Sequence, residues 1–173
     1  MRKFCDSIRN NKVETSASWD KDGNLLLSKS GDAHSVNFTA KEIVKMQNAA
    51  VSVHNHPGGN EPFSPDDVNF AGTIHAGEIV VVSQDMRFSL KPADGKTWPA
   101  DPGHYPQGDI NYKYMVGIQG IQNSPRADTY NLQIELATRK SESAGRAEYD
   151  RIARQVWKDN APKLGLIYKE EKI

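Results

Sequence analysis

Two histidines and a nearby aspartate are the residues whose types and spacing best suit chemistry. His54 and His56 follow the apolar run 49–53, which predicts a buried strand. Side chains two apart on a strand share a face, so both imidazoles can bind one ion. Ser64-Pro65-Asp66-Asp67 then has the composition of a helix start, and Asp67 can be directed back towards the pair. Two imidazoles and one carboxylate leave the fourth position of a tetrahedral zinc ion open, as in catalytic zinc sites.

Each half of this pattern has a simpler explanation when it is taken alone. A His-x-His pair on a strand is weak support for a metal site. A Ser-x-x-Asp sequence is often only a helix cap. The combination is more specific, because the cap at Ser64 lies one short loop from the histidines and supplies the carboxylate that the pair lacks.

The combined string is His54-Asn55-His56-Pro57, six further residues, and Ser64-x-x-Asp67. It resembles the signature of the JAMM metalloprotease family, in which His-x-His-Pro is followed by a spacer and Ser-x-x-Asp. The resemblance implies that His54, His56 and Asp67 bind Zn²⁺, with a water in the fourth position. It also implies that Ser64 steadies the oxyanion of a tetrahedral intermediate. The resemblance covers about 12–91 and implies a cytidine-deaminase-like α/β fold, a mixed β-sheet flanked by helices.

The family also requires a glutamate upstream of the histidines, and the candidates are Glu14 and Glu42. Glu42 lies in Thr39-Ala40-Lys41-Glu42, a capping box that opens a helix, and so already has a local role. Glu14 lies in the strand-like stretch 13–19, just before a hairpin signal, which matches where the family places its glutamate. The resemblance therefore implies that Glu14 acts as general base and then as general acid.

The chain has 173 residues and no net charge, and its length predicts a single domain. We expect a JAMM-like core over 1–91, and over 92–173 an irregular insertion and a C-terminal helical extension of the same domain. Lys plus Arg and Asp plus Glu both number 22, so no net field attracts nucleic acid or an acidic membrane. No apolar run is long enough for a membrane span or a signal peptide, so we expect a cytoplasmic protein. The single cysteine, Cys5, excludes an internal disulfide and is expected to be inert, which leaves the chemistry to the metal.

Periodicity and turn signals predict the elements around this motif. Phe4 and Ile8 are expected to reach the core from a short lead-in. The expected strands and helices are an antiparallel meander over 12–19, 24–28 and 34–38, a helix over 39–48, a helix over 65–76, and strands over 78–83 and 87–91. His34, on the third strand, and His75 are expected to lie away from the metal.

The second half of the chain carries weaker signals. The prolines and glycines of 92–109 predict an irregular segment, whose Trp98, His104 and Tyr105 line a groove or only pin the loop. Residues 109–119 fit either a strand or a short helix. A long helical region is predicted over 127–160, broken near 141–145, and then an edge strand over 164–168.

Three functions of different classes remain open at this point. The first is a zinc peptidase or isopeptidase acting on a protein or peptide, in deconjugation of a ubiquitin-like tail or in phage or bacterial protein processing. The second is a non-proteolytic relative of the RadC type, in which His-Asn-His-Pro also occurs. The third is a structural or interaction module that keeps the fold, which is expected if Glu14 lies away from the histidines.

Overall fold

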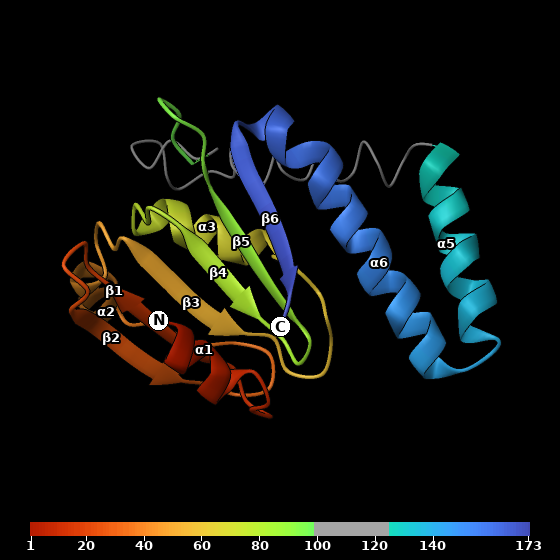
Figure 1. The fold of residues 1–173 in the computed structure, drawn as a ribbon, viewed down its shortest axis with the longest axis horizontal. Coiled ribbons are helices and arrows are strands. Elements are labelled where there is room, and N and C mark those ends of the chain that lie inside the picture. Colours follow the sequence, from red (N-terminus) through yellow and green to blue (C-terminus); the bar gives the residue numbers. More distant parts are fainter. Residues whose placement is uncertain (99–124) are drawn as a thin grey trace.

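A six-stranded mixed β-sheet organises this computed structural model, which describes residues 1–98 and 125–173 (Figure 1). The strands lie side by side in the order β2-β1-β3-β4-β5-β6. Only β3 and β4 run parallel, and the other neighbours in this sheet are antiparallel. The mixed α/β class predicted from the sequence is confirmed. The strands are β1 (Thr15–Trp19), β2 (Leu25–Ser30), β3 (Val51–Asn55), β4 (Ile79–Val82), β5 (Met86–Pro92) and β6 (Leu166–Lys172).

The parallel pair β3 and β4 is joined by a loop and helix α3 (Pro65–Thr73). Parallel neighbours need such a crossover, because the chain must return to the starting edge of the sheet. In Figure 1, α3 lies behind the strands that it connects. The carboxyl end of β3 and the first turn of α3 are therefore joined by the short segment 56–64.

Both faces of the sheet are buried along β4, whose four residues all lie in the core. Ile79 and Val81 belong to a cluster that includes Val68 and Ile74 of the α3 segment. Val80 and Val82 point to the opposite face. The second cluster on that face is Cys5, Ile8, Val53, Val80 and Val82.

The N-terminal lead-in is helix α1 (Arg2–Ile8), which the sequence analysis did not predict. Its expected contacts are confirmed, since Ile8 is buried and Phe4 packs edge-on against Trp19 with ring centroids 5.1 Å apart. Cys5 is also buried, and burial raises the pKa of its thiol. A buried thiol with a raised pKa is a poor nucleophile, in agreement with the expected inert role.

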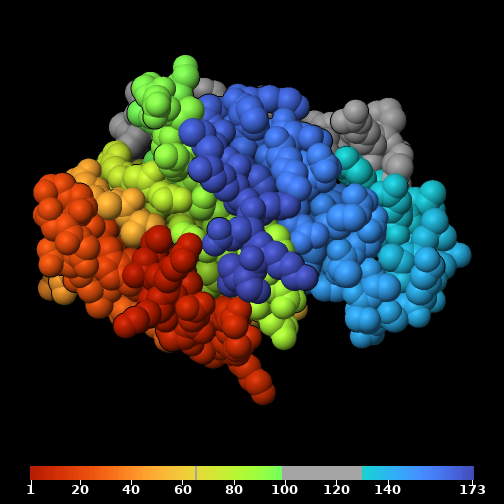
Figure 2. Space-filling model, in the orientation of Figure 1, coloured from red at the N-terminus to blue at the C-terminus, as the bar shows by residue number. Residues whose placement is uncertain are grey.

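The C-terminal part forms helices α5 (Pro125–Thr138) and α6 (Glu142–Asn160), the short 3₁₀ helix η2 (Ala161–Leu164) and β6. The predicted break in the long helical region is confirmed, with Ser141 capping α6 through the N–H of Ala144. The predicted edge strand is also confirmed, since β6 pairs with β5 at one end of the sheet order. Helix α6 packs beside this edge and α5 packs outside α6, at one end of the molecule (Figures 1 and 2).

The predicted third strand of the meander, 34–38, is wrong, because 31–39 forms a loop. Asp32 Oδ1 accepts hydrogen bonds from the N–H groups of His34 and Ser35, at 2.8 and 2.9 Å. The Asp32 N–H also donates to the Ser35 carbonyl, so local bonds replace those of a strand ladder. β2 is therefore an edge of the sheet.

The remaining predictions concern helix ends and residues near 92–119. Helix α2 (Ala40–Lys45) and α3 are both shorter than expected. Trp98 is buried and donates its indole N–H to the Ala76 carbonyl, so it pins the loop. His104, Tyr105 and 109–119 lie outside the described residues. Within 1–98 and 125–173, no helix is both long enough and apolar enough to cross a membrane.

Candidate metal site

Four side chains from three segments of the chain converge at the carboxyl end of β3. Glu14, His54, His56 and Asp67 each offer a ligating atom, and these atoms all lie within 4.8 Å of one another. The two imidazole Nε2 atoms are 3.1 Å apart. Asp67 Oδ1 lies 2.9 Å from His54 Nε2, and Asp67 Oδ2 lies 3.5 Å from His56 Nε2. Such a cluster could hold a metal ion.

The strand places both histidines on the face that α3 covers. His54 is paired in register with Val81 of β4, which packs into the core on the α3 side. His56 follows two residues later, and its backbone N–H donates to the Val82 carbonyl, so it continues the alignment of the strand. The period of two residues therefore gives the two imidazoles a common direction, as the sequence predicted.

The first turn of α3 directs Asp67 at this pair. Ser64 caps the helix, and the Ser64 backbone N–H and Oγ donate to Asp67 Oδ2 at 2.6 and 2.8 Å. In return the Asp67 N–H donates to Ser64 Oγ at 3.2 Å. The predicted N-cap is confirmed. This reciprocal capping box fixes the Asp67 carboxylate, while its Oδ1 atom is directed at His54.

Glu14 comes from the other side, immediately before β1. Its Oε1 lies 4.0 Å from His54 Nε2. Its backbone is bonded on both sides to the loop after β2, because the Glu14 N–H donates to the Asp32 carbonyl and the Glu14 carbonyl accepts from Gly31. Glu42 lies instead in the predicted capping box with Thr39 and is not part of the cluster. The geometry thus brings Glu14, and not Glu42, to the histidines.

Asn55, between the two histidines, holds the backbone on both sides of Glu14. Its side chain is fully buried. Asn55 Oδ1 accepts from the Thr15 N–H at 2.7 Å, and Nδ2 donates to the Val13 carbonyl at 3.1 Å. The sequence analysis missed this role. The available signal was a polar side chain on the inward face of a buried strand, which must find hydrogen-bond partners there.

Helix α6 supports the histidine loop from the C-terminal half of the chain. His56 Nδ1 donates to the Glu61 carbonyl at 3.2 Å, which leaves Nε2 directed at the cluster. Arg146 Nη2 of α6 donates a hydrogen bond to Glu61 Oε2 at 3.1 Å. The Asn60 N–H donates to Oδ2 of Asp150, also on α6, at 2.8 Å. No local signal predicted these contacts, because their partners are far apart in sequence.

The charges of the cluster differ because its members are unequally buried and unequally paired. Burial would raise the pKa of Asp67, but the adjacent His54 and His56 lower it well below its usual value. Burial would lower the pKa of His56, but the hydrogen bond and charge of Asp67 raise it to about 9. Burial raises the pKa of Glu14, against the opposing effect of the histidines. Asp67 is thus the fixed anion, and Glu14 is the carboxylate that takes up a proton more readily than an ordinary glutamate.

The cluster opens into a cavity of about 570 Å³ that also exposes Ser64. One wall is the loop 31–39, where Phe38 stacks on Phe70 of α3 with ring centroids 5.0 Å apart. His34 lines the cavity but is exposed and not a member of the cluster. His75 is exposed and also lies outside the cluster. A ligand of a few residues can therefore reach all four clustered side chains.

Comparison of the chain with models of protein families, with curated proteins and with solved structures gave no match. The resemblance to the JAMM family therefore depends on the motif and on the geometry of the cluster.

We predict that the purified protein binds about one divalent metal ion per chain at this cluster. The double substitution His54→Ala/His56→Ala should abolish binding, because it removes both nitrogen ligands. The matched control is His34→Ala/His75→Ala, which removes two exposed histidines outside the cluster and should keep the metal. Elemental analysis after gel filtration measures the difference. Equal metal content in both double variants would place the metal elsewhere.

We also predict that Asn55→Ala lowers the free energy of unfolding by about 2 kcal/mol, because the buried Thr15 N–H and the partly buried Val13 carbonyl lose their partner. Metal content should change little, since Asn55 points away from the ligands. Asn11→Ala, which removes one part-buried hydrogen bond to Thr15 Oγ1, is the control and should cost less. Urea denaturation gives the stabilities, and amide exchange of Thr15 should accelerate only in Asn55→Ala. Unchanged exchange there would contradict the assigned role.

Proposed function

We propose that this protein is a zinc-dependent hydrolase of peptide or isopeptide bonds, a metallopeptidase of the JAMM type with a JAMM-like fold. The observation that carries the proposal is the position of Glu14 beside the histidine and aspartate ligands. Its Oε1 lies 4.0 Å from His54 Nε2, in an open cavity, and burial raises its pKa. A metal site with only a structural role has no need of a carboxylate placed in this way.

The donor set and its dimensions fit zinc. Two imidazoles and one carboxylate with an open fourth position are typical of catalytic zinc sites. Zinc–ligand bonds of about 2.0–2.1 Å in a tetrahedron place the ligands about 3.3 Å from each other. The Nε2 atoms of His54 and His56 are 3.1 Å apart, and Asp67 Oδ1 lies 2.9 Å from His54 Nε2, both close to that value. The other oxygen, Asp67 Oδ2, lies 3.5 Å from His56 Nε2. When bound, zinc lowers the pKa of a water molecule towards neutrality and polarises the scissile carbonyl.

In this proposal Glu14 moves the proton. Its carboxylate accepts a proton from the attacking water and then delivers it to the nitrogen of the leaving amine. A pKa above the ordinary value suits both steps, because the group must hold the proton between them. The C–N bond breaks as the amine leaves, and the products are a carboxylic acid and an amine. The backbone bonds of Asn55 to Val13 and Thr15 keep Glu14 in place for this transfer.

Ser64 supplies a second polar group in the same cavity. Its hydroxyl donates to Asp67 Oδ2, at 2.8 Å, in the arrangement described above. Rotation about the Cβ–Oγ bond would direct the same hydrogen to the oxyanion that develops on the scissile carbonyl, while Oγ still accepts from the Asp67 N–H. Ser64 thus combines the cap of α3 with stabilisation of the transition state.

The substrate is a protein or peptide. The interaction-module alternative expected Glu14 to lie apart from the histidines, and the separation of 4.0 Å between Glu14 Oε1 and His54 Nε2 favours the hydrolase instead. The balanced charge of the chain also argues against nucleic acid as the main substrate. The decisive experiment is a screen of the zinc-loaded protein against peptide libraries and ubiquitin-like conjugates, with a chelator-treated sample as control. Chelator-sensitive cleavage is the expected result.

Replacing Glu14 by glutamine should abolish hydrolysis while leaving zinc bound, because the amide keeps the shape but has no basic oxygen for the proton. The control is Glu42→Gln, which removes a carboxylate outside the cluster and should keep full activity. Zinc content and turnover are measured on the same preparations. A Glu14→Gln protein with the turnover of the parent would assign proton transfer to another group.

Replacing Ser64 by alanine separates its two roles. Loss of the cap should lower stability by about 1 kcal/mol, while loss of an oxyanion donor should lower turnover by roughly a hundredfold. Thermal denaturation and steady-state kinetics measure the two effects. Thr39→Ala, which removes the cap of α2, is the control and should reduce stability alone. Parental turnover in Ser64→Ala would leave the serine as a cap only.

A further inference from the structure

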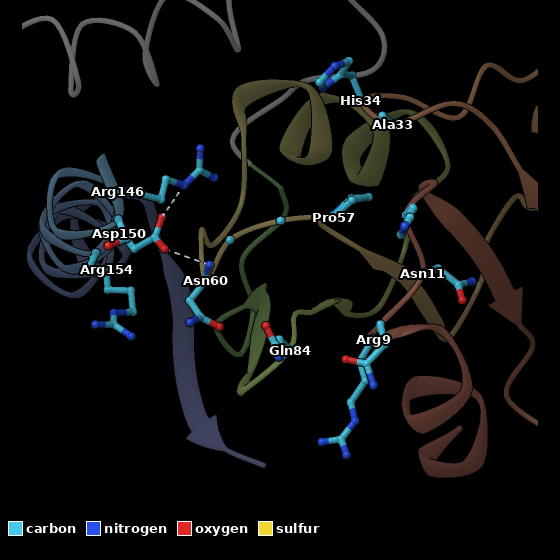
Figure 3. Close-up of a pocket in the computed structure, with 16 residues that line it drawn as sticks. Arg9, Asn11, Ala33, His34, Pro57, Asn60, Gln84, Arg146, Asp150 and Arg154 are labelled. Carbon is cyan, nitrogen blue, oxygen red and sulfur yellow. Dashed lines mark hydrogen bonds and ion pairs between the residues drawn. The ribbon is translucent and has the colours of Figure 1, made fainter. Parts of the chain in front are cut away.

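A second cavity, of about 800 Å³, adjoins the cavity into which Glu14, His54, His56 and Asp67 open, which we call the metal cavity (Figure 3). It is bounded by the end of α1, the loop after β2, the loop 57–60 and one side of α6. Four residues, Ala33, His34, Pro57 and Arg146, line both cavities. A ligand can therefore extend from the clustered side chains into this second space. The proposed hydrolysis gives this space no role.

The second cavity is lined by four cations, of which only Arg146 is paired with carboxylates among the described residues. Arg9, Lys12, Arg146 and Arg154 are all in its lining, and in Figure 3 Arg146 and Arg154 lie on the α6 side of the cavity and Arg9 on the opposite side, near the end of α1. The carboxylate of the lining is Asp150, which is buried and bonded to Arg146 and to the Asn60 N–H. Arg9, Lys12 and Arg154 form no ion pair with any residue in 1–98 or 125–173. Arg9 and Arg154 are also only partly exposed.

The metal cavity has the opposite character. Its lining contains four carboxylates and one arginine, Arg146. The carboxylates are Glu14, Glu61, Asp66 and Asp67. The two adjoining cavities therefore favour different parts of one ligand, a neutral or cationic part at the cluster and an anionic part beyond Pro57.

The loop between the cavities adds hydrogen-bond donors to these cations. The backbone N–H groups of Gly58 and Gly59 donate to no described residue. Gly58 has a positive φ of 84°, and an added Cβ there would meet nothing within 4 Å. A ligand can therefore approach the backbone closely at Gly58, whereas the Arg146 guanidinium already packs against Gly59. Free N–H groups next to guanidinium groups are the donors with which proteins bind carboxylates.

We propose that this second cavity is a carboxylate-binding subsite that selects peptides with an acidic group near the scissile bond. The acidic group is either the side chain of a glutamate or aspartate or a free C-terminus, and both offer the same two oxygens. As a substrate subsite the assignment depends on the proposed hydrolase activity, but the binding site itself does not. A cavity of this size between α1 and α6 accepts a few residues of peptide. The basic stripe that a nucleic acid backbone requires extends much further.

Binding tests this directly with the full chain, loaded with zinc. The probes are rhodamine-labelled Gly-Glu-Gly-Glu-Gly as the free acid, the same peptide with a C-terminal amide, Gly-Gln-Gly-Gln-Gly amide, and a single-stranded DNA oligonucleotide. We expect the acidic peptides to bind and the neutral peptide not to bind. Comparison of free acid with amide separates a C-terminal carboxylate from a side-chain carboxylate. Fluorescence anisotropy at fixed ionic strength measures all four probes.

Variants assign the binding to the cavity. Arg9→Gln and Arg154→Gln should each weaken binding of the acidic peptides by roughly five- to tenfold, as expected for one partly exposed charge-assisted hydrogen bond, and the double variant should abolish it. Arg2→Gln, which removes an exposed arginine at the other end of α1, should bind like the parent. Circular dichroism and zinc content should be the same in all variants.

Each result has a distinct meaning. Equal binding of the neutral peptide, no binding of any peptide, or acidic binding that persists in the double variant would overturn the proposal. DNA that binds more tightly than the acidic peptides through Arg9 and Arg154 would overturn it in favour of nucleic acid. Arginine-dependent binding without cleavage of any peptide would retain the carboxylate site and refute the hydrolase. Where cleavage occurs, Arg154→Gln should raise KM for acidic peptides and leave kcat unchanged, which a defect of the metal cluster would not do.

Discussion

The buried carboxylate of Asp67 is the group on which the site depends. It lies between two imidazoles, and its net charge is stable there only because His54 and His56 face it and Ser64 donates to it twice. In turn that charge raises the pKa of His56 against the effect of burial. The same arrangement could hold a metal ion, because two imidazoles and a carboxylate converge there.

This convergence follows from the topology of the sheet. A parallel β3–β4 pair requires a crossover, and the crossover helix α3 begins within a short loop of the strand that carries the histidines. The end of β3 and the positive first turn of α3 therefore meet on one side of the sheet. Glu14 reaches the same place because β1 is antiparallel to β3, so that the start of β1 lies beside the end of β3. Thus β1, β3 and α3 each bring one of their ends to the cluster.

The parts of the site that could be predicted from the sequence are those set by local rules. His54 and His56 are related by the strand period, and Ser64 and Asp67 by the capping box, so their positions were predictable from spacing alone. Asn55 was missed although it lies between the two histidines, because its partners Val13 and Thr15 are visible only once β1 is placed beside β3. The expected strand 34–38 failed for a local reason, since Asp32 binds the backbone of His34 and Ser35 in a turn. The support from α6 had no sequence signal, because it depends on pairs such as Asn60 and Asp150.

The contacts of α6 connect the C-terminal half to the cluster through Glu61. Arg146 bonds both Glu61 and Asp150, and it lines both cavities. The Glu61 carbonyl fixes the ring of His56, so the side chains of α6 reach a ligand through one residue. A ligand in the second cavity would contact the same helix and the same loop 57–60. The second cavity and the contacts that orient His56 therefore share Arg146 and the loop that leads from His56 to Glu61.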